Sequence, residues 1–408
     1  TASLALYESS VSAVRAPFFR SASDLSLRVS DEHVDDVVAP LRFELIRSVV
    51  ESPSVEAVDM QEGGWRVRLL RLERFQQGTA EEVQTQLHGI TKQDGLILDL
   101  RGNPGGPLNQ AIRVSNEFLP RGDLIVYTRG RIANSDQDYH ARDDGDHMDL
   151  PLVVLVNRNS ASASEIVAGA IQDHDRGLIV GETTFGKALV QSIFRVSQEA
   201  GLALTTARYF TPSGRMIQRP WDETFDEYVT YSLRDQKPPE HDISERQLTD
   251  GGREVFGGGG IEPDHFMAGP IEGFDPTAFG RLLAARQEFA TFAEQFSAEG
   301  DTRIKDQGNG RRRLSRGFVI GEAMLQEFRS QIQSRGVAIN EESFATDLGF
   351  IKAMMRYQIN LALFSIEEAR RNLTESDPQA RFAVSLFPEA ERLFRLSRQG
   401  SAIAAGQD

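Results

Sequence analysis

Short apolar runs mark the positions of the predicted strands. Leu152 to Val156 is an unbroken apolar run, Leu178 to Val180 is a second, and Leu96 to Leu98 belongs to a third. Runs of this length without alternation are typical of strands that are buried on both faces. They predict an α/β core with a sheet covered on two sides.

Helical patterns lie between these strands. Thr79 to Leu87 is amphipathic, and further helices are expected after Pro107 and after Ser162. Val190 to Val196 and Leu202 to Phe210 are separated by a turn-like segment and predict a β-hairpin. The region from 43 to 270 should therefore alternate strands and helices.

Beyond residue 271 the apolar positions follow a helical spacing. Two amphipathic stripes are visible, one carried by Phe279, Leu282, Leu283, Phe289, Phe292 and Phe296, the other by Phe344, Leu348, Ile351, Met355, Ile359, Leu363 and Ile366. We interpret residues 271–408 as a C-terminal helical domain that serves packing or oligomerisation.

Composition narrows the functional classes. The chain has 408 residues with 40% hydrophobic residues, enough for two or three domains. Its formal net charge of −15 argues against general nucleic-acid binding. There is no cysteine, so disulfides and thiolate metal sites are excluded. No apolar run approaches a membrane span and no signal peptide opens the chain, so we expect a soluble, mature or trimmed form.

The strongest chemical signal is a serine at a predicted strand-to-helix junction. Ser162 and Glu165 match the S-x-x-E capping box directly before an apolar helix. Unpaired N–H groups at a helix N-terminus favour negative charge, so an alkoxide forming on Ser162 would be stabilised. A serine that only caps the helix is the alternative, and the neighbouring residues must decide between the two.

A lysine follows at a suitable distance. Lys187 comes after the strand at 178–180 and the tight segment from Gly181 to Gly186, which can return it to the helix start. Lysine is a poor base at its ordinary pKa of about 10.4, but burial without a carboxylate can lower that value by several units. It can then take a serine proton. Gln191 lies four positions further and could orient the amine.

Three other sites fit less well. The segment from Gly181 to Lys187 resembles a P-loop, but Ala188 replaces the hydroxyl that would bind magnesium. A Ser-His-Asp triad fails because His174 should lie about 18 Å along the same helix from Ser162. The histidines show no paired-ligand spacing, so we expect neither a catalytic metal nor a cofactor.

A glycine turn follows the strand at 95–99. The sequence GLILDLRGNPGG ends in Gly105 and Gly106, whose backbone can approach a ligand and point N–H groups into a cavity. An ordinary strand-to-helix turn is the alternative. We interpret Asp99 and Arg101 as a structural pair.

Together these segments resemble the carboxy-terminal processing (tail-specific) serine proteases, an S41-type peptidase family. The resemblance covers about residues 43 to 266 and is carried by LILDLRGNPGG at 96–106, VLVNRNSASASEIVAGAIQD at 154–173, VGETTFGKALVQ at 180–191, ARYFTPSGRMIQ at 207–218 and GGGGIEPD at 257–264. It implies a core of the crotonase/ClpP-like α/β spiral type.

The resemblance also implies roles for individual residues. Ser162 would be the nucleophile, Lys187 the general base, and Gln191 a support for the lysine. Backbone groups of the oxyanion site would be supplied or shaped by Gly105, Gly106 and Ala163. Glu165, Asp173 and Thr184 would support the structure of the site, and Ser160 and Ser164 would be cap or core serines.

One part of the family pattern does not fit. Relatives carry a PDZ domain between an N-terminal helical segment and the core, but residues 1–42 leave room only for a helix at 1–16 and a remnant at Asp31 to Val38. Either most of that module is lost or the sequence joins two separated segments. We favour the second, because Val34 and its neighbours would otherwise lack a domain to pack against. We also expect a resting form.

The function predicted from the sequence is a Ser/Lys endopeptidase acting at or near the C-terminal region of unfolded or membrane-associated proteins. The resemblance implies a periplasmic or other extracytoplasmic location, a homo-oligomer, and room for an activating adaptor protein. Two alternatives remain, a non-catalytic peptide-binding scaffold on the same fold and an acyl-CoA-type enzyme on a related core.

Overall fold

The computed structural model describes residues 53–90, 93–131, 135–145, 148–197, 200–220, 231, 243–269, 271, 274–297, 314 and 317–405. The predicted helix at 1–16, the Asp31 to Val38 segment and the first residues of the region predicted to begin at 43 lie outside these ranges.

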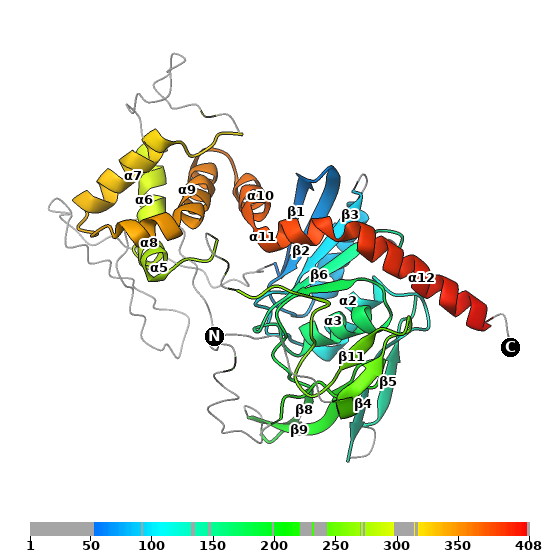
Figure 1. Cartoon of the computed structure of the whole chain (residues 1–408). Helices are drawn as coiled ribbons and strands as arrows, with labels where there is room; N and C mark the ends of the chain where they lie inside the picture. The colour runs from blue at the N-terminus through cyan, green and yellow to red at the C-terminus, as the bar shows by residue number, and fades with distance from the viewer. Residues whose placement is uncertain are drawn as a thin grey trace. The chain divides into compact units, whose positions relative to one another are not determined.

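A six-stranded sheet forms the centre of the core (Figure 1). Its strands lie in the order β1-β2-β3-β6-β7-β12. The first two strands are an antiparallel hairpin, and the others run parallel to β2. The strands are β1 (Val55–Glu62), β2 (Trp65–Leu72), β3 (Gly95–Asp99), β6 (Leu152–Val156), β7 (Leu178–Gly181) and β12 (His265–Phe266). The three apolar runs are therefore confirmed as strands.

Both faces of this sheet are buried, which explains why its strands are apolar without alternation. Leu96, Leu98 and Val154 face α1 (Thr79–His88), α2 (Leu108–Asn116) and α3 (Ala163–Asp173) in one core cluster. Ile97, Val153 and Leu155 point to the opposite face and belong to a second cluster.

The second face is covered by the end of the chain. α11 (Pro378–Ser385) and α12 (Phe387–Ala405) lie along the sheet (Figure 1). Ala380, Ala383, Val384 and Phe387 of these helices belong to the core cluster on this face. The helices expected in the C-terminal domain thus divide between this layer and a separate helical cluster. The sequence pattern predicted helices here but not their partner surface.

The separate cluster has its own apolar core. It contains α5 (Ala278–Ala285), α6 (Glu288–Ser297), α7 (Glu322–Ser334), α8 (Glu341–Thr346) and α9 (Leu348–Leu363). Each predicted stripe is divided between successive helices, because Gln287 takes a φ of 56° between α5 and α6 and Asp347 separates α8 from α9. α10 (Ile366–Ser376) packs against both α9 and β1.

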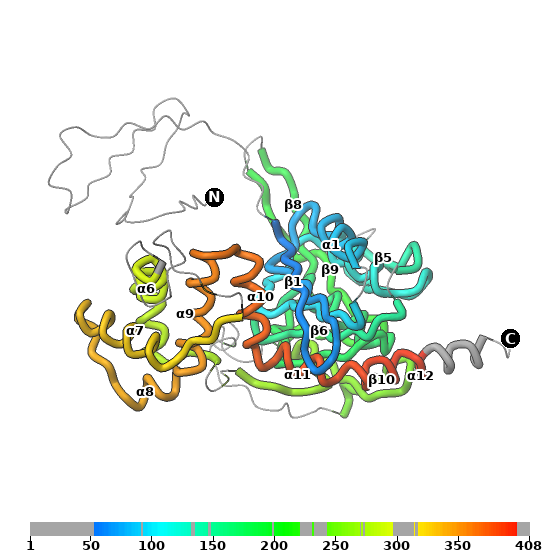
Figure 2. The backbone as a smooth tube through the Cα atoms, turned by 90° about the horizontal axis from the view of Figure 1, so that it is seen from above, coloured from blue at the N-terminus to red at the C-terminus, as the bar shows by residue number. Residues whose placement is uncertain are grey.

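A four-stranded antiparallel sheet, β5-β4-β9-β8, adjoins α3. It consists of β4 (Leu124–Gly130), β5 (Gln137–His140), β8 (Leu189–Arg195) and β9 (Gly201–Phe210). The predicted hairpin is β8 with β9, and its tip extends away from the core in Figure 2. A short segment, η2 (Ile243–Glu245), precedes the small β10 (Arg246–Leu248) and β11 (Glu254–Phe256) hairpin.

Candidate active site

The turn between β6 and α3 holds one serine in an unusual conformation. Ser162 precedes α3 directly and has φ 58° and ψ −111°, a region that residues other than glycine rarely adopt. Such strain costs on the order of 1–3 kcal/mol and gathers at functional sites, where the surrounding structure enforces it. Ser162 is partly exposed, whereas Ala161 and Ala163 are buried.

The two neighbouring serines have structural contacts. Ser160 is buried and donates its hydroxyl hydrogen to the Leu100 carbonyl at 2.8 Å. Ser164 is also buried and donates to the Asn103 carbonyl at 3.0 Å. Because both hydroxyls are committed to the glycine turn, Ser162 is the serine of this run that a substrate can reach.

Glu165 joins the serine turn to the lysine loop. Its carboxylate accepts hydrogen bonds from the Ser162 N–H at 2.7 Å and the Lys187 N–H at 2.9 Å. It also accepts from the Gly186 N–H and the Thr184 hydroxyl, each at 2.6 Å. Complete burial raises the pKa of Glu165 above its ordinary value, and these four donors oppose that shift. Glu165 thus fixes the main chains of both predicted catalytic residues.

Lys187 lies at the end of the loop that follows β7, and its side chain is half-buried. Gly186, just before it, has a φ of 87°, which favours glycine at this tight turn. No hydrogen bond joins the Ser162 hydroxyl to the Lys187 amine among the residues that the structure describes, and no carboxylate pairs with that amine there. Glu165 therefore connects the main chains of Lys187 and Ser162, while their side chains are not hydrogen-bonded to each other.

The glycine turn presses against Ser162. A Cβ atom added to Gly105 would lie 2.8 Å from the Ser162 Cβ and 2.5 Å from the Ala161 carbonyl oxygen, so only glycine fits. The Gly105 N–H is bonded to the Asn103 side-chain oxygen at 2.9 Å, and the Gly105 carbonyl accepts from Phe75. Gly105 therefore shapes the site, while the N–H of Gly106 points away from Phe75 because the two groups of a trans peptide oppose one another.

The other predicted support residues divide into two groups. Thr184 belongs to the site, since its hydroxyl donates to Glu165 and accepts from the Ile261 N–H at 2.7 Å. Asp173 lies at the far end of α3, where its carboxylate bonds the buried Arg215 and accepts from the Ser213 N–H at 2.9 Å. It holds the helix end and does not approach Ser162.

Gln191 lies exposed on β8, directly after a register shift between Val190 and Gln191. Its support of Lys187 stays a prediction.

Sequence reasoning missed Tyr209 as a member of the site. This side chain is 2% exposed, and its hydroxyl lies 2.7 Å from the Lys187 carbonyl and 3.1 Å from the Ser162 carbonyl. Its position on β9 does not indicate these contacts. The one hint in the sequence is that Tyr209 lies in the segment at 207–218, which resembles the protease family.

The rejected alternatives are placed elsewhere. His174 ends α3 and contacts Asp250 and the Leu124 carbonyl, so it is remote from Ser162. Glu182 is paired with Arg158 at 2.5 Å, which places a carboxylate where a P-loop would hold phosphate. The structural pair of Asp99 and Arg101 is confirmed, and Arg101 also reaches Asp377 at the start of α11.

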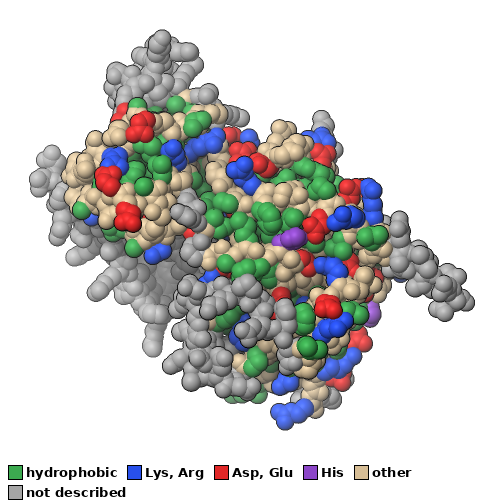
Figure 3. All heavy atoms as spheres, viewed as in Figure 1, with side chains coloured by type: hydrophobic (Ala, Val, Ile, Leu, Met, Phe, Trp, Pro, Cys, Tyr) green, Lys and Arg blue, Asp and Glu red, His purple; other side chains and the backbone are tan. Residues whose placement is uncertain are grey.

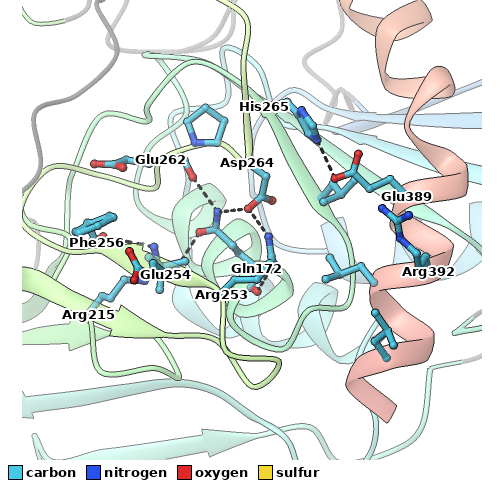
Figure 4. A pocket seen from close by; sticks show the side chains of 15 residues that line it. Gln172, Arg215, Arg253, Glu254, Phe256, Glu262, Asp264, His265, Glu389 and Arg392 are labelled. Carbon is cyan, nitrogen blue, oxygen red and sulfur yellow. Dashed lines mark hydrogen bonds and ion pairs between the residues drawn. The ribbon is translucent and has the colours of Figure 1, made fainter. Parts of the chain in front are cut away.

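Two cavities border this core. One of about 950 Å³ opens at the carboxyl ends of β3 and β6 and is lined by Asn157, Arg158 and Asn159 of the serine turn. Parallel sheets commonly bind ligands at this edge. The other, of about 530 Å³, lies between Gln172, Arg253 and α12 (Figure 4). Gln172 is ten residues along α3 from Ser162, about 15 Å away, so this cavity is separate from the site.

The described residues provide neither a candidate metal site nor a candidate membrane-spanning helix. None of their acidic and histidine side chains form a group of three that could hold a metal ion. No described helix is both long and apolar enough to cross a membrane.

Part of the chain is similar to known proteins. Residues 66–223 match the model of Peptidase family S41. A carboxyl-terminal-processing protease of Synechocystis sp. is 43% identical over 183 residues, which cover 44% of this chain and 42% of the relative. A carboxy-terminal-processing protease of Bartonella bacilliformis is 44% identical over 186 residues, with the same two coverages of 44% and 42%.

A solved structure, the photosystem II D1 C-terminal processing protease, is 34% identical, with a TM-score of 0.34 over 43% of this chain and 47% of that one. The chain spans less than half the length of the curated relatives it matches.

Proposed function

We propose that this chain is a serine endopeptidase that cleaves proteins at or near their C-terminal region, because residues 66–223 match the model of Peptidase family S41. Ser162 is the nucleophile and Lys187 the general base. The observation that carries the proposal is the Glu165 carboxylate, which bonds the N–H groups of both residues and so couples a partly exposed, strained serine to a lysine 25 positions away.

The residues present can perform acyl transfer. The neutral Lys187 amine takes the proton of the Ser162 hydroxyl as the oxygen attacks the carbonyl carbon of the scissile peptide. The resulting ammonium then gives that proton to the departing amine when the C–N bond breaks, leaving an acyl ester on Ser162. Water, deprotonated by the same amine, attacks the ester and releases the new carboxyl terminus.

Backbone groups stabilise the tetrahedral intermediates in this scheme. We assign the oxyanion donors to the N–H groups of Ala163, at the first position of α3, and Gly106, while Gly105 supplies the close approach. The helix N-terminus adds a favourable dipole for the developing negative charge. Gln191 would orient the Lys187 amine in the catalytic arrangement.

The absence of a Ser162 to Lys187 hydrogen bond among the described residues supports a resting arrangement. Activation then requires a small movement of the lysine side chain into hydrogen-bond reach of the serine, roughly 3 Å. An activating adaptor protein is one means of producing it. Such control suits a protease whose substrates are unfolded or membrane-associated proteins.

Location and assembly are further parts of the proposal. We place the protein in the cell envelope, with the periplasm as the compartment, on the family resemblance of the sequence motifs. Assembly into a homo-oligomer is supported by apolar side chains exposed on the separate helical cluster, such as Leu282 at 45% and Val319 at 78%.

The experiment that tests the activity uses an unstructured polypeptide with a labelled C-terminus. Wild type should cleave it, and a fluorophosphonate probe should modify Ser162, as mapped by mass spectrometry. Ser162→Ala should abolish both results and leave the melting temperature nearly unchanged, since loss of a helix cap costs on the order of 1 kcal/mol.

Ser160→Ala and Ser164→Ala are the matched controls, because these hydroxyls bond backbone carbonyls. They should lower stability and keep cleavage. A peptide-binding scaffold would bind the substrate without labelling or cleavage, and an acyl-CoA enzyme would process a thioester but not the polypeptide. Either outcome would refute the protease assignment.

A further inference from the structure

We infer that Tyr209 is a positioning residue for the catalytic pair, acting through the main-chain carbonyls of Lys187 and Ser162. This inference rests on the proposed protease function. It assigns the hydroxyl a task that Glu165 cannot perform, because a carboxylate accepts hydrogen bonds and cannot hold a carbonyl.

The contacts of Lys187 show the need for such a group. Its N–H donates to the Glu165 carboxylate at 2.9 Å, and its carbonyl accepts from the Tyr209 hydroxyl at 2.7 Å. Both polar groups of the Lys187 main chain are therefore held by side chains, one from the first turn of α3 and one from β9. The point from which the lysine side chain extends is fixed on two sides.

Ser162 lies against the same two side chains. Glu165 accepts from its N–H at 2.7 Å, and the Tyr209 hydroxyl lies 3.1 Å from its carbonyl oxygen. That carbonyl also accepts from the N–H groups of Glu165 and Ile166 within α3. Tyr209 has one hydrogen to donate, and the shorter distance assigns it mainly to Lys187. The phenol oxygen thus lies between the two carbonyl oxygens, nearer to that of Lys187.

Tyr209 is itself rigidly placed. It is 2% exposed, its N–H donates to the Ala188 carbonyl at 3.1 Å, and it pairs with Thr128 across β4. Its ring belongs to the same core cluster as Val167 and Ile217. A hydroxyl on a buried, sheet-anchored ring has little freedom, so its removal releases Lys187 without moving the rest of the site.

The test compares Tyr209→Phe with Tyr127→Phe. Tyr127 pairs with Phe210 on the adjacent strand and stacks on it, so its variant also removes one hydroxyl from the same sheet. Because small misplacements of catalytic groups can cost up to about 100-fold in rate, Tyr209→Phe should lower kcat roughly 10- to 100-fold with KM within about twofold. Labelling of Ser162 by the fluorophosphonate probe should slow in parallel, and Tyr127→Phe should match wild type.

Binding separates positioning from general damage to the fold. In a Ser162→Ala background, adding Tyr209→Phe should leave the Kd for the labelled polypeptide unchanged. Weaker binding, or a kcat within twofold of wild type, would overturn the inference. If wild type cleaves nothing and Ser162 stays unlabelled, the protease function itself has failed. Ser162-dependent cleavage that Tyr209→Phe leaves intact removes the positioning role alone.

A second substitution covers the case in which Tyr209→Phe unfolds. Replacing Tyr209 by a ring-fluorinated tyrosine keeps the shape and the donor but lowers the pKa of the phenol. Its ionised form cannot donate and repels both carbonyls, so cleavage should fall at an alkaline pH at which wild type is still active. A pH profile equal to that of wild type would contradict the inference.

Discussion

At the scale of single residues, the site depends on a few hydrogen bonds between side chains and main-chain groups. The run of three serines from Ser160 to Ser164 shows how much of this arrangement could be predicted from the sequence. Ser162 was distinguishable because the S-x-x-E pattern places it at a helix start, and the structure leaves it partly exposed while burying Ser160 and Ser164. The second partner of the Lys187 main chain was not foreseeable, because Tyr209 approaches through tertiary packing and not through spacing.

Lys187→Arg should be as inactive as Lys187→Ala. A guanidinium keeps its proton at any pH at which the protein is folded, so it cannot accept one from Ser162. Loss of a general base costs at least about 100-fold in rate. Cleavage of the labelled polypeptide measures this, with melting temperatures to verify folding. If the arginine variant retained activity, another group would have to accept the serine proton.

At the scale of elements, α3 carries function at one end and stability at the other. In its first turn, the Glu165 carboxylate bonds the N–H groups of the lysine loop. At its other end lies His174, whose ring nitrogens contact Asp250 and the Leu124 carbonyl at 2.7 Å each. Burial lowers the pKa of His174, but the Asp250 and Leu124 bonds and the charge of Asp123 outweigh it, and the pKa rises to about 9. A cation at a helix C-terminus is also favoured by the dipole.

His174→Gln should therefore change how stability depends on pH. Because the folded-state pKa of about 9 exceeds the ordinary 6.5, the contribution of His174 is fully present below pH 6.5 and is lost as the pH rises through 9. The shift corresponds to on the order of 3 kcal/mol. Urea unfolding should show the variant less stable than wild type at pH 6, with the difference disappearing above pH 9.

His88→Gln is the matched control, since His88 is exposed at the end of α1. It should follow the wild-type dependence on pH. A constant difference between His174→Gln and wild type from pH 6 to pH 9.5 would show that His174 acts by packing and not by charge.

The strands and helices of the core were predictable because their signals are local. All side chains of Leu152 to Val156 are buried, as expected for a strand covered on both faces, and the run is too short for a typical helix. The position of α11 and α12 was not predictable. The sequence of an amphipathic helix shows which of its faces is apolar, but it does not show which surface that face covers. Nothing in the sequence around Ala380 and Phe387 indicates that they pack against the sheet.

At the scale of the whole molecule, charge and packing have different distributions. The net charge is −15, yet on the face in Figure 3 the basic and acidic side chains of the described residues are interspersed. A mixed surface does not build the single-sign field that attracts a polyanion there. Ion pairs join parts of the chain that are distant in sequence. Arg101, which follows β3, pairs with Asp377, which precedes α11.

The covering of the sheet by α11 and α12 leads to the last prediction, that Phe387→Ala destabilises the core around this sheet as a whole. Phe387 is fully buried, its ring meets Trp65 of β2 edge-on at 5.3 Å, and a Cβ atom on Gly95 would lie 2.4 Å from it. Removing such a ring costs about 3–5 kcal/mol. Urea unfolding should measure that loss, and cleavage should fail at a lower urea concentration in parallel.

Leu396→Ala on the same helix is the control, because Leu396 is 59% exposed and its loss should cost less than about 0.5 kcal/mol. If the two variants unfolded and lost cleavage at the same urea concentration, α12 would be an independent tail. The expected result instead makes the end of the chain part of the core, since the sheet that positions Ser162 and Lys187 would lose the cover of one face.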